Sequence, residues 1–147
     1  PCPSILDPPV AQREQPMEIV NILVAAVGAF AFGAVWYMSM GKAWMAAAGI
    51  EPGPDGRPAN GSNPMPFVVG LLAMILVSGM MRHIFSMAAI DTVGKGLVAG
   101  FGIGAFFITP WVAMNYAFAM RSAKLTVIDS VNAIVGCAIM GAILNLF

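Results

Sequence analysis

The chain has 147 residues, a formal net charge of zero and only 10% charged residues. Soluble domains carry about 25% charged residues, so the composition excludes a large soluble domain. The neutral balance and the absence of a basic cluster give no support to a nucleic-acid partner.

Residues 1–16 are predicted to form a proline-rich, extended tail ahead of a membrane domain at residues 17–147. The tail holds five prolines, which fix φ and lack the backbone N–H that a helix needs. It also lacks the basic start and apolar stretch of a signal peptide. Cys2 lies in this tail and Cys137 in the last apolar stretch, so we expect no disulfide between them.

Four apolar stretches follow the tail, and the longest uncharged one covers residues 96–120. About twenty apolar residues cross the roughly 30 Å hydrocarbon core of a bilayer. We therefore expect an all-α, polytopic membrane protein with four transmembrane helices and a short interfacial helix after the first. The predicted spans are residues 18–40, 65–81 (with an alternative end at 90), 96–120 and 125–147.

The first span presents small residues along one face. Ala25, Ala29 and Gly33 recur at four-residue spacing, which places them one above the other on a helix. Small residues let helix backbones approach closely in lipid, where no hydrophobic drive for association remains. We expect this face to pack against another helix.

An aromatic and basic group follows these small residues. Tryptophan and tyrosine gather at membrane interfaces, and a lysine extends its ammonium toward the headgroups. A helix from residue 17 to 49 would be about 50 Å long, which is too long for one crossing. We therefore expect a bend near Gly41, with residues 42–48 along the membrane surface. The predicted interfacial anchors are Trp36, Tyr37, Lys42 and Trp44.

The second span follows a proline- and glycine-rich loop at residues 51–64 and meets Arg82 and His83 after some seventeen residues. Two interpretations are open. The span ends at Arg82 and a short interfacial segment follows, or a longer tilted helix continues toward Ile90 and lets Arg82 reach the headgroups. We favour the first.

The third span opens with Gly96, Gly100 and Gly104 at four-residue spacing. This pattern predicts close packing against a neighbouring helix, although transmembrane helices are also rich in glycine in general. Pro110 has no backbone donor for the Phe106 carbonyl, so we expect a kink there.

The fourth span begins after a turn with two positive charges. Thr126 and Asp129 match a capping box, in which a hydroxyl cap precedes a carboxylate by three residues. Capping and the helix dipole account for this acid more simply than a proton or ion relay does, because no second acid or histidine faces it. The predicted polar cluster comprises Asn115, Arg121, Lys124, Asp129 and Asn132.

His83 is the single histidine, and Gly79 four residues earlier leaves room above its imidazole. Such a site suits an axial ligand of a pigment or haem, whereas an interfacial histidine beside Arg82 is the simpler interpretation. Asn115 and Tyr116 are candidates for a headgroup or quinone, or for interfacial anchoring. No cofactor is firmly predicted, and a lipid, quinone or pigment at the periphery remains open.

Charge asymmetry predicts the orientation. The loops after the first and third spans hold more basic residues than the opposite side, and basic loops stay in the cytoplasm. We therefore expect a multi-pass protein of the bacterial inner membrane with both termini in the periplasm. The first group is Lys42, Arg57, Arg121 and Lys124, and the second is Arg13, Lys95 and Arg82.

Several segments resemble a bacterial family of four-span membrane proteins, domain-of-unknown-function family 1761. The resemblance covers residues 17–147 and implies the four-helix fold without an activity. Members often carry a histidine near the start of the fourth helix, where this chain has Asn132, so no histidine chemistry is carried over to that position. The matching segments are Gly33-Ala-Val-Trp-Tyr37, Gly41-Lys-Ala-Trp-Met45, Asn115-Tyr116, Arg121-Ser122, Lys124-Leu125, Ile128-Asp129 and Met140-Gly-Ala-Ile-Leu144.

These patterns favour a non-catalytic accessory or scaffolding subunit of a larger membrane complex over an enzyme. Photosynthetic (reaction centre–light-harvesting) and respiratory complexes are the candidate hosts, and membrane lipids and other integral subunits are the expected partners. The alternative is a small homo-oligomeric transporter or channel with Asp129 in its path. Against it, the two halves show no internal repeat and no helix is lined with polar residues.

Overall fold

The computed structural model describes residues 15–59 and 61–146, and all of its regular elements are helices. Four spans are long and apolar enough to cross a membrane, so the predicted all-α, four-span fold is confirmed. The predicted tail lies outside the described residues except for its last two, which begin the first helix. The elements are α1 (Gln15–Ala48), α2 (Met65–Met87), α3 (Val93–Ile103), the π-helical turn η2 (Gly104–Ile108), α4 (Thr109–Phe118) and α5 (Ala123–Ile143).

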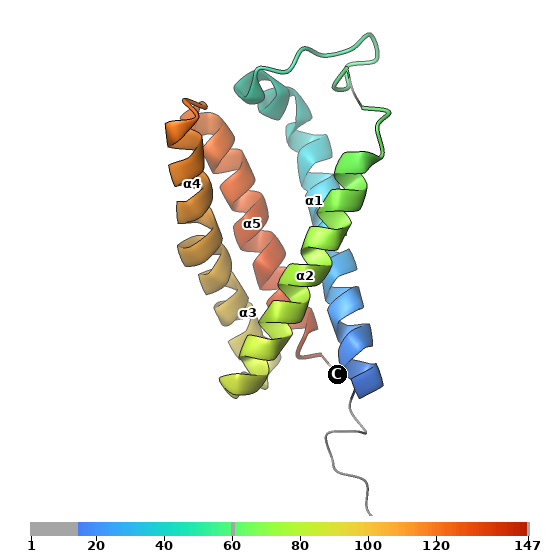
Figure 1. The fold of residues 1–147 in the computed structure, drawn as a ribbon, viewed down its shortest axis with the longest axis vertical. Coiled ribbons are helices and arrows are strands. Elements are labelled where there is room, and N and C mark those ends of the chain that lie inside the picture. The colour runs from blue at the N-terminus through green and yellow to red at the C-terminus, as the bar shows by residue number, and fades with distance from the viewer. Residues whose placement is uncertain (1–14, 60, 147) are drawn as a thin grey trace, which may run out of the picture.

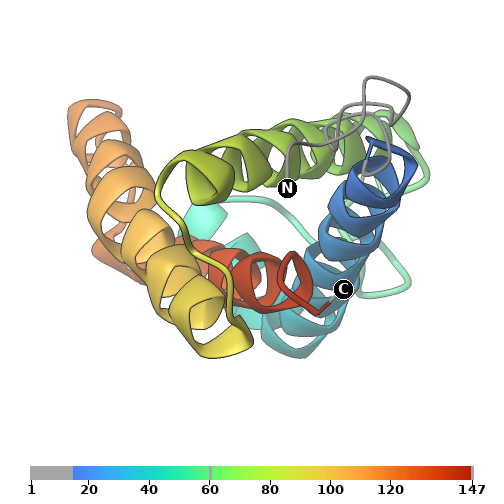
Figure 2. The same ribbon diagram turned by 90° about the horizontal axis from the view of Figure 1, so that it is seen from below.

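The helices form an open arrangement rather than a closed four-helix bundle. α5 packs against both α1 and α3, whereas α2 packs mainly against α1. Figure 2 shows this order around the molecule, from α2 through α1 and α5 to α3 and α4. The third span is a single rod in which η2 joins α3 to α4 (Figure 1).

The core lies toward the end of the molecule where α1 begins and where α2 and α5 end. Its members are apolar residues from these three helices, and Ser78 of α2 donates to the Ile22 carbonyl at 2.9 Å. The first half of α2 contributes no buried residue, and Leu72 and Leu76 are 56% and 74% exposed. α2 is therefore anchored mainly by its second half. The buried core residues are Ala25, Ala29, Met81, Phe85, Met140 and Leu144.

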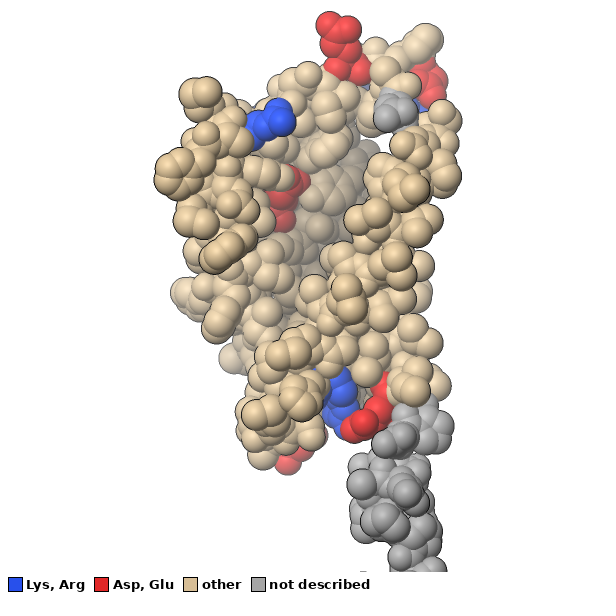
Figure 3. All heavy atoms as spheres, in the orientation of Figure 1, with Lys and Arg blue, Asp and Glu red and all other residues tan. Residues whose placement is uncertain are grey.

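A hollow separates α2 from α4 on one face of the molecule (Figure 3). It follows from the one-sided anchoring of α2, because α2 and α4 diverge from the core end (Figure 1). Acidic atoms are visible inside this hollow.

The interfacial segment predicted after the first span is part of α1 rather than a separate helix. α1 remains helical through Gly41 to Ala48, although its last turns lean toward α5 in Figure 1. The reason is that this part of α1 is bonded to α5, and the turn before α5 also holds the helix end. Ser122 donates to the Ala47 carbonyl at 2.9 Å and Arg121 to the Ala48 carbonyl at 3.3 Å.

The sequence analysis favours an end of the second span at residue 81. This prediction is wrong, because α2 continues through Arg82 to Met87. Arg82 donates to Glu18 of α1 at 3.3 Å, so its charge is compensated by a neighbouring helix. A paired charge at a helix–helix contact does not need to terminate the span.

The third and fourth spans depart from the prediction at particular turns. The irregularity expected near Pro110 is the π-helical turn η2 directly before it, where the Thr109 N–H donates to the Gly104 carbonyl. α5 begins at Ala123, and Ser122 caps it by accepting from the Leu125 N–H at 3.3 Å. The predicted Thr126–Asp129 capping box is therefore wrong, since both residues lie inside the helix. The predicted continuation to residue 147 is likewise too long, because α5 ends at Ile143.

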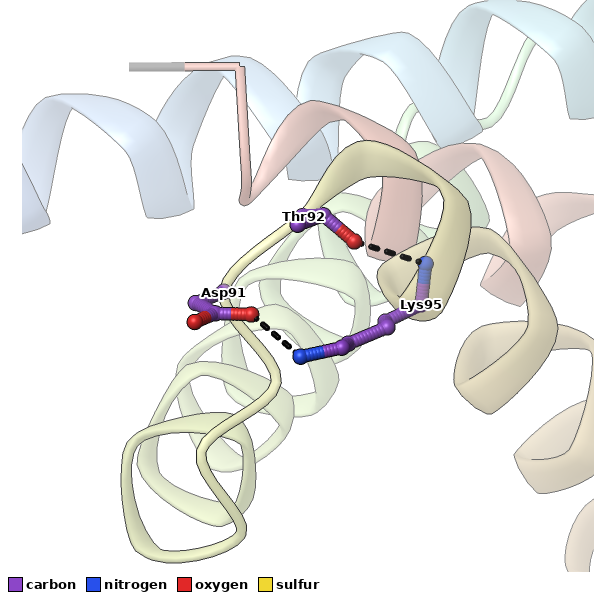
Figure 4. Close-up of polar contacts among 3 residues, drawn as sticks. All are labelled: Asp91, Thr92 and Lys95. Atoms are coloured by element: carbon purple, nitrogen blue, oxygen red, sulfur yellow. Dashed lines mark hydrogen bonds and ion pairs between the residues drawn. The ribbon is translucent and has the colours of Figure 1, made fainter.

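The turn between α2 and α3 is fixed by two side-chain contacts (Figure 4). Thr92 caps α3 by accepting from the Lys95 N–H at 3.3 Å, and Lys95 Nζ donates to Asp91 at 2.7 Å. The ammonium lowers the pKa of Asp91 below its usual value. The ion pair therefore contributes to stability above the unfolded pKa of about 3.9. This contribution is lost as the pH falls through the lower pKa of Asp91 in the folded protein.

Replacing Thr92 with alanine should destabilise the start of α3 by about 1 kcal/mol, because the Lys95 N–H loses its acceptor. Hydrogen exchange at the Lys95 amide in detergent measures this. Asp91→Asn is the matched control, since it removes only an exposed ion pair of little worth. Equal protection of the Lys95 amide in both variants would contradict the capping role.

Candidate functional site

Asp129 is the centre of a polar site between three helices. The Tyr37 hydroxyl and the Trp44 indole N–H donate to Oδ1 at 2.7 and 3.1 Å. The Tyr116 hydroxyl donates to Oδ2 at 2.8 Å. One carboxylate therefore joins α5 to α1 and to α4.

The sequence places these donors by helix periodicity. Tyr37 and Trp44 are seven residues apart on α1, about two turns, so they lie on the same face. Their rings are in edge contact, with centroids 5.8 Å apart. Trp36 adds a further bond, from its indole N–H to the Ile128 carbonyl at 3.0 Å. Three aromatic donors of α1 thus hold one turn of α5.

Asn132 lies one turn beyond Asp129 and extends the site. A Cβ at Gly33 would lie 3.2 Å from Asn132 Oδ1, so the absence of a side chain at Gly33 makes room for the amide. The amide also approaches the Tyr37 hydroxyl. Among the described residues, Asn132 Oδ1 is shielded from solvent and has no hydrogen-bond partner.

The carboxylate carries a charge that no nearby cation balances. Asp129 is the seventh residue of α5, roughly 9 Å from its start at 1.5 Å per residue. No lysine, arginine or histidine nitrogen of residues 15–59 and 61–146 lies within 4 Å of it. The indole N–H can only donate, so Oδ1 acts as an acceptor in this bond, and all three side-chain donors to the carboxylate are neutral groups.

The predicted polar cluster is brought together only in part. Asn132 adjoins Asp129, whereas Asn115 and Lys124 are exposed and Arg121 bonds the end of α1 instead. Among the predicted interfacial anchors, Lys42 is exposed, but Trp36, Tyr37 and Trp44 donate into the protein. Tyr37 continues the four-residue series of Ala25, Ala29 and Gly33. The sequence therefore contained a signal that Tyr37 faces another helix.

The predicted helix-packing residues lie at helix contacts. A Cβ at Gly96 would overlap the Gly141 carbonyl, and one at Gly100 would overlap the Cys137 carbonyl. A Cβ at Gly104 would lie 2.5 Å from the Ile134 Cα. The backbones of the third span and α5 are therefore in direct contact over about two helical turns, from Gly96 in α3 to Gly104 in η2.

His83, the candidate pigment ligand, is exposed on α2. A Cβ at Gly79 would lie 4.0 Å from the Ile22 side chain, so this glycine faces α1. Within residues 15–59 and 61–146, no group of three histidine, cysteine, aspartate or glutamate side chains could hold a metal ion.

Comparison with known proteins identifies the family. The family described as "Protein of unknown function (DUF1761)" matches residues 20–145, which include every residue of the Asp129 site and all four spans except the first two residues of the first span. The chain belongs to this family. Neither the curated proteins nor the solved structures gave a match.

Proposed function

We propose that this DUF1761 protein is a non-catalytic subunit that binds another integral membrane protein through the hollow between α2 and α4. The single observation that carries the proposal is the one-sided anchoring of α2. Its second half is held by α1, and its first half diverges with exposed apolar side chains. Helix association in lipid depends on close packing, and the hollow leaves these surfaces for a partner helix.

The Asp129 site supports a binding role over a chemical one. Its three donors are fixed by α1 and α4, and each satisfies a carboxylate oxygen. Such bonds hold helices in place. The proposal extends to a bacterial inner-membrane host, and photosynthetic and respiratory complexes are the first to be examined. Lipids fill the remaining apolar surface.

Native membranes solubilised in a mild detergent test this proposal. The protein should migrate with a complex much larger than its 15.3 kDa, and deleting the gene should change the assembly of that complex. The rate of the complex per assembled unit should remain nearly unchanged. Removing residues 1–14 should weaken copurification while the four helices still insert. A lone homodimer that moves a solute in liposomes, with flux stopped by Asp129→Asn, would replace this proposal with the transporter.

The orientation can be tested with the native cysteines. The structure puts the loop at residues 49–64 and the turn before α5 at the same end, and that end holds Lys42, Arg57, Arg121 and Lys124. A membrane-impermeant maleimide applied to intact cells should therefore label Cys2 and spare the buried Cys137. Labelling of Cys2 only after lysis would reverse the orientation.

A further inference from the structure

We infer that the partner presents a transmembrane helix with a lysine or arginine that pairs with Asp129. The inference rests on the proposed function and names the chemistry of the partner. Its starting point is the charge balance of the site. The other paired acids of the described chain, Glu18 and Asp91, each have a basic partner within 4 Å, but Asp129 has only neutral donors.

An unbalanced carboxylate inside the membrane is costly. Ionisable residues in transmembrane segments pair with one another or line cavities. Neutral donors compensate part of the lost hydration, and a cation would add the Coulomb attraction that a low-dielectric site strengthens. Asp129 is neither fully buried nor fully exposed, so its carboxylate retains access from outside the helix contacts.

The hollow supplies the approach. It opens between α2 and α4, and acidic atoms are visible inside it (Figure 3). The surfaces that flank it in Figure 3 are largely uncharged, and Tyr116 of α4 donates to Asp129. A helix in this position would carry one basic residue at the depth of Asp129, about six residues inside the membrane surface. Charge complementarity therefore selects a basic transmembrane helix.

Designed peptides provide the test with the full chain in phosphatidylglycerol vesicles, which contain no ammonium lipid. The probe is a polyleucine helix with neutral flanks and one lysine six residues from an end, carrying an acceptor for tryptophan fluorescence. A matched peptide has glutamine at that position, and a third has its lysine near the opposite end. Energy transfer should show that the first peptide binds about tenfold more tightly than the other two.

Variants of the protein assign this preference to Asp129. Asp129→Asn should bind the lysine and glutamine peptides equally, whereas Asp129→Glu should keep the preference. Asp91→Asn, an exposed acid outside the spans, should behave as the native chain. If Asp129→Asn does not fold, the three-peptide comparison on the native chain still decides.

Equal binding of all three peptides by the native chain would overturn the cation pairing and leave helix docking intact. No binding of any peptide would overturn the inference as well. The proposed function is tested separately by the size of the complex in native membranes. If phosphatidylethanolamine removes the lysine preference in an Asp129-dependent way, the cation is a lipid headgroup, and the basic-helix inference is wrong.

Discussion

Replacing Gly100 with leucine should force α3 away from α5 and destabilise the protein by about 1–3 kcal/mol, the usual cost of overpacking. A Cβ at this position would overlap the Cys137 carbonyl and lie 3.1 Å from the Ala138 Cα. Both neighbours are backbone atoms of a helix, so no side chain can rotate away. The whole of α5 must shift, and its contacts with α1 shift with it.

Gly102 is the matched control, because it lies on the same helix and a Cβ there has no neighbour within 4 Å. Gly102→Leu should be neutral or slightly stabilising, since glycine costs a helix up to about 1 kcal/mol. Thermal unfolding of both variants in the same detergent gives the comparison. Equal melting temperatures for the two variants would show that the α3–α5 contact is not tight in solution.

The four-span fold was predictable because membrane crossing depends on local composition alone. Helix ends were less predictable, because they depend on partners from elsewhere in the chain. Arg82 looked like the end of a span, but Glu18 on another helix neutralises it. Thr126 and Asp129 match a capping box in the sequence, but Ser122 caps the helix one turn earlier, and Asp129 accepts from α1 and α4 instead. In both cases the partner of the charged residue lies far away in the sequence, on α1.

The site was half predictable for the same reason. Asp129 and Asn132 were identified as intramembrane polar residues, and their placement on one helix made their proximity certain. Two of the three donors to Asp129 come from residues 85 and 92 positions away on α1, and a single sequence does not reveal which helices are neighbours. Amphipathic aromatic residues suit a membrane interface and a buried carboxylate equally well. The small-residue series that ends at Tyr37 was the available signal, because it marks the face of α1 that meets α5.

Replacing Asp129 with alanine should have the second large effect and destabilise the protein by about 2–4 kcal/mol. Three donors lose their acceptor, namely Tyr37, Trp44 and Tyr116. Each unsatisfied buried donor costs about 1–3 kcal/mol in soluble proteins, whereas side-chain bonds in membrane proteins average about 0.6 kcal/mol. The expected loss of stability lies between three times the value for membrane proteins and three times the value for soluble proteins. Asp129→Asn should cost roughly half as much, because its amide oxygen still accepts.

A double-mutant cycle separates the hydrogen bonds from a general loss of packing. Tyr37→Phe should be destabilising in the native background and nearly neutral when Asp129 is already alanine, because the hydroxyl then has no carboxylate to meet. Tyr116→Phe should behave in the same way through its bond to Oδ2. Unfolding in mixed micelles with increasing denaturing detergent measures all six proteins. Additive effects in both cycles would mean that the contribution of each hydroxyl to stability does not depend on Asp129. The carboxylate would then have no part in joining α1 and α4 to α5.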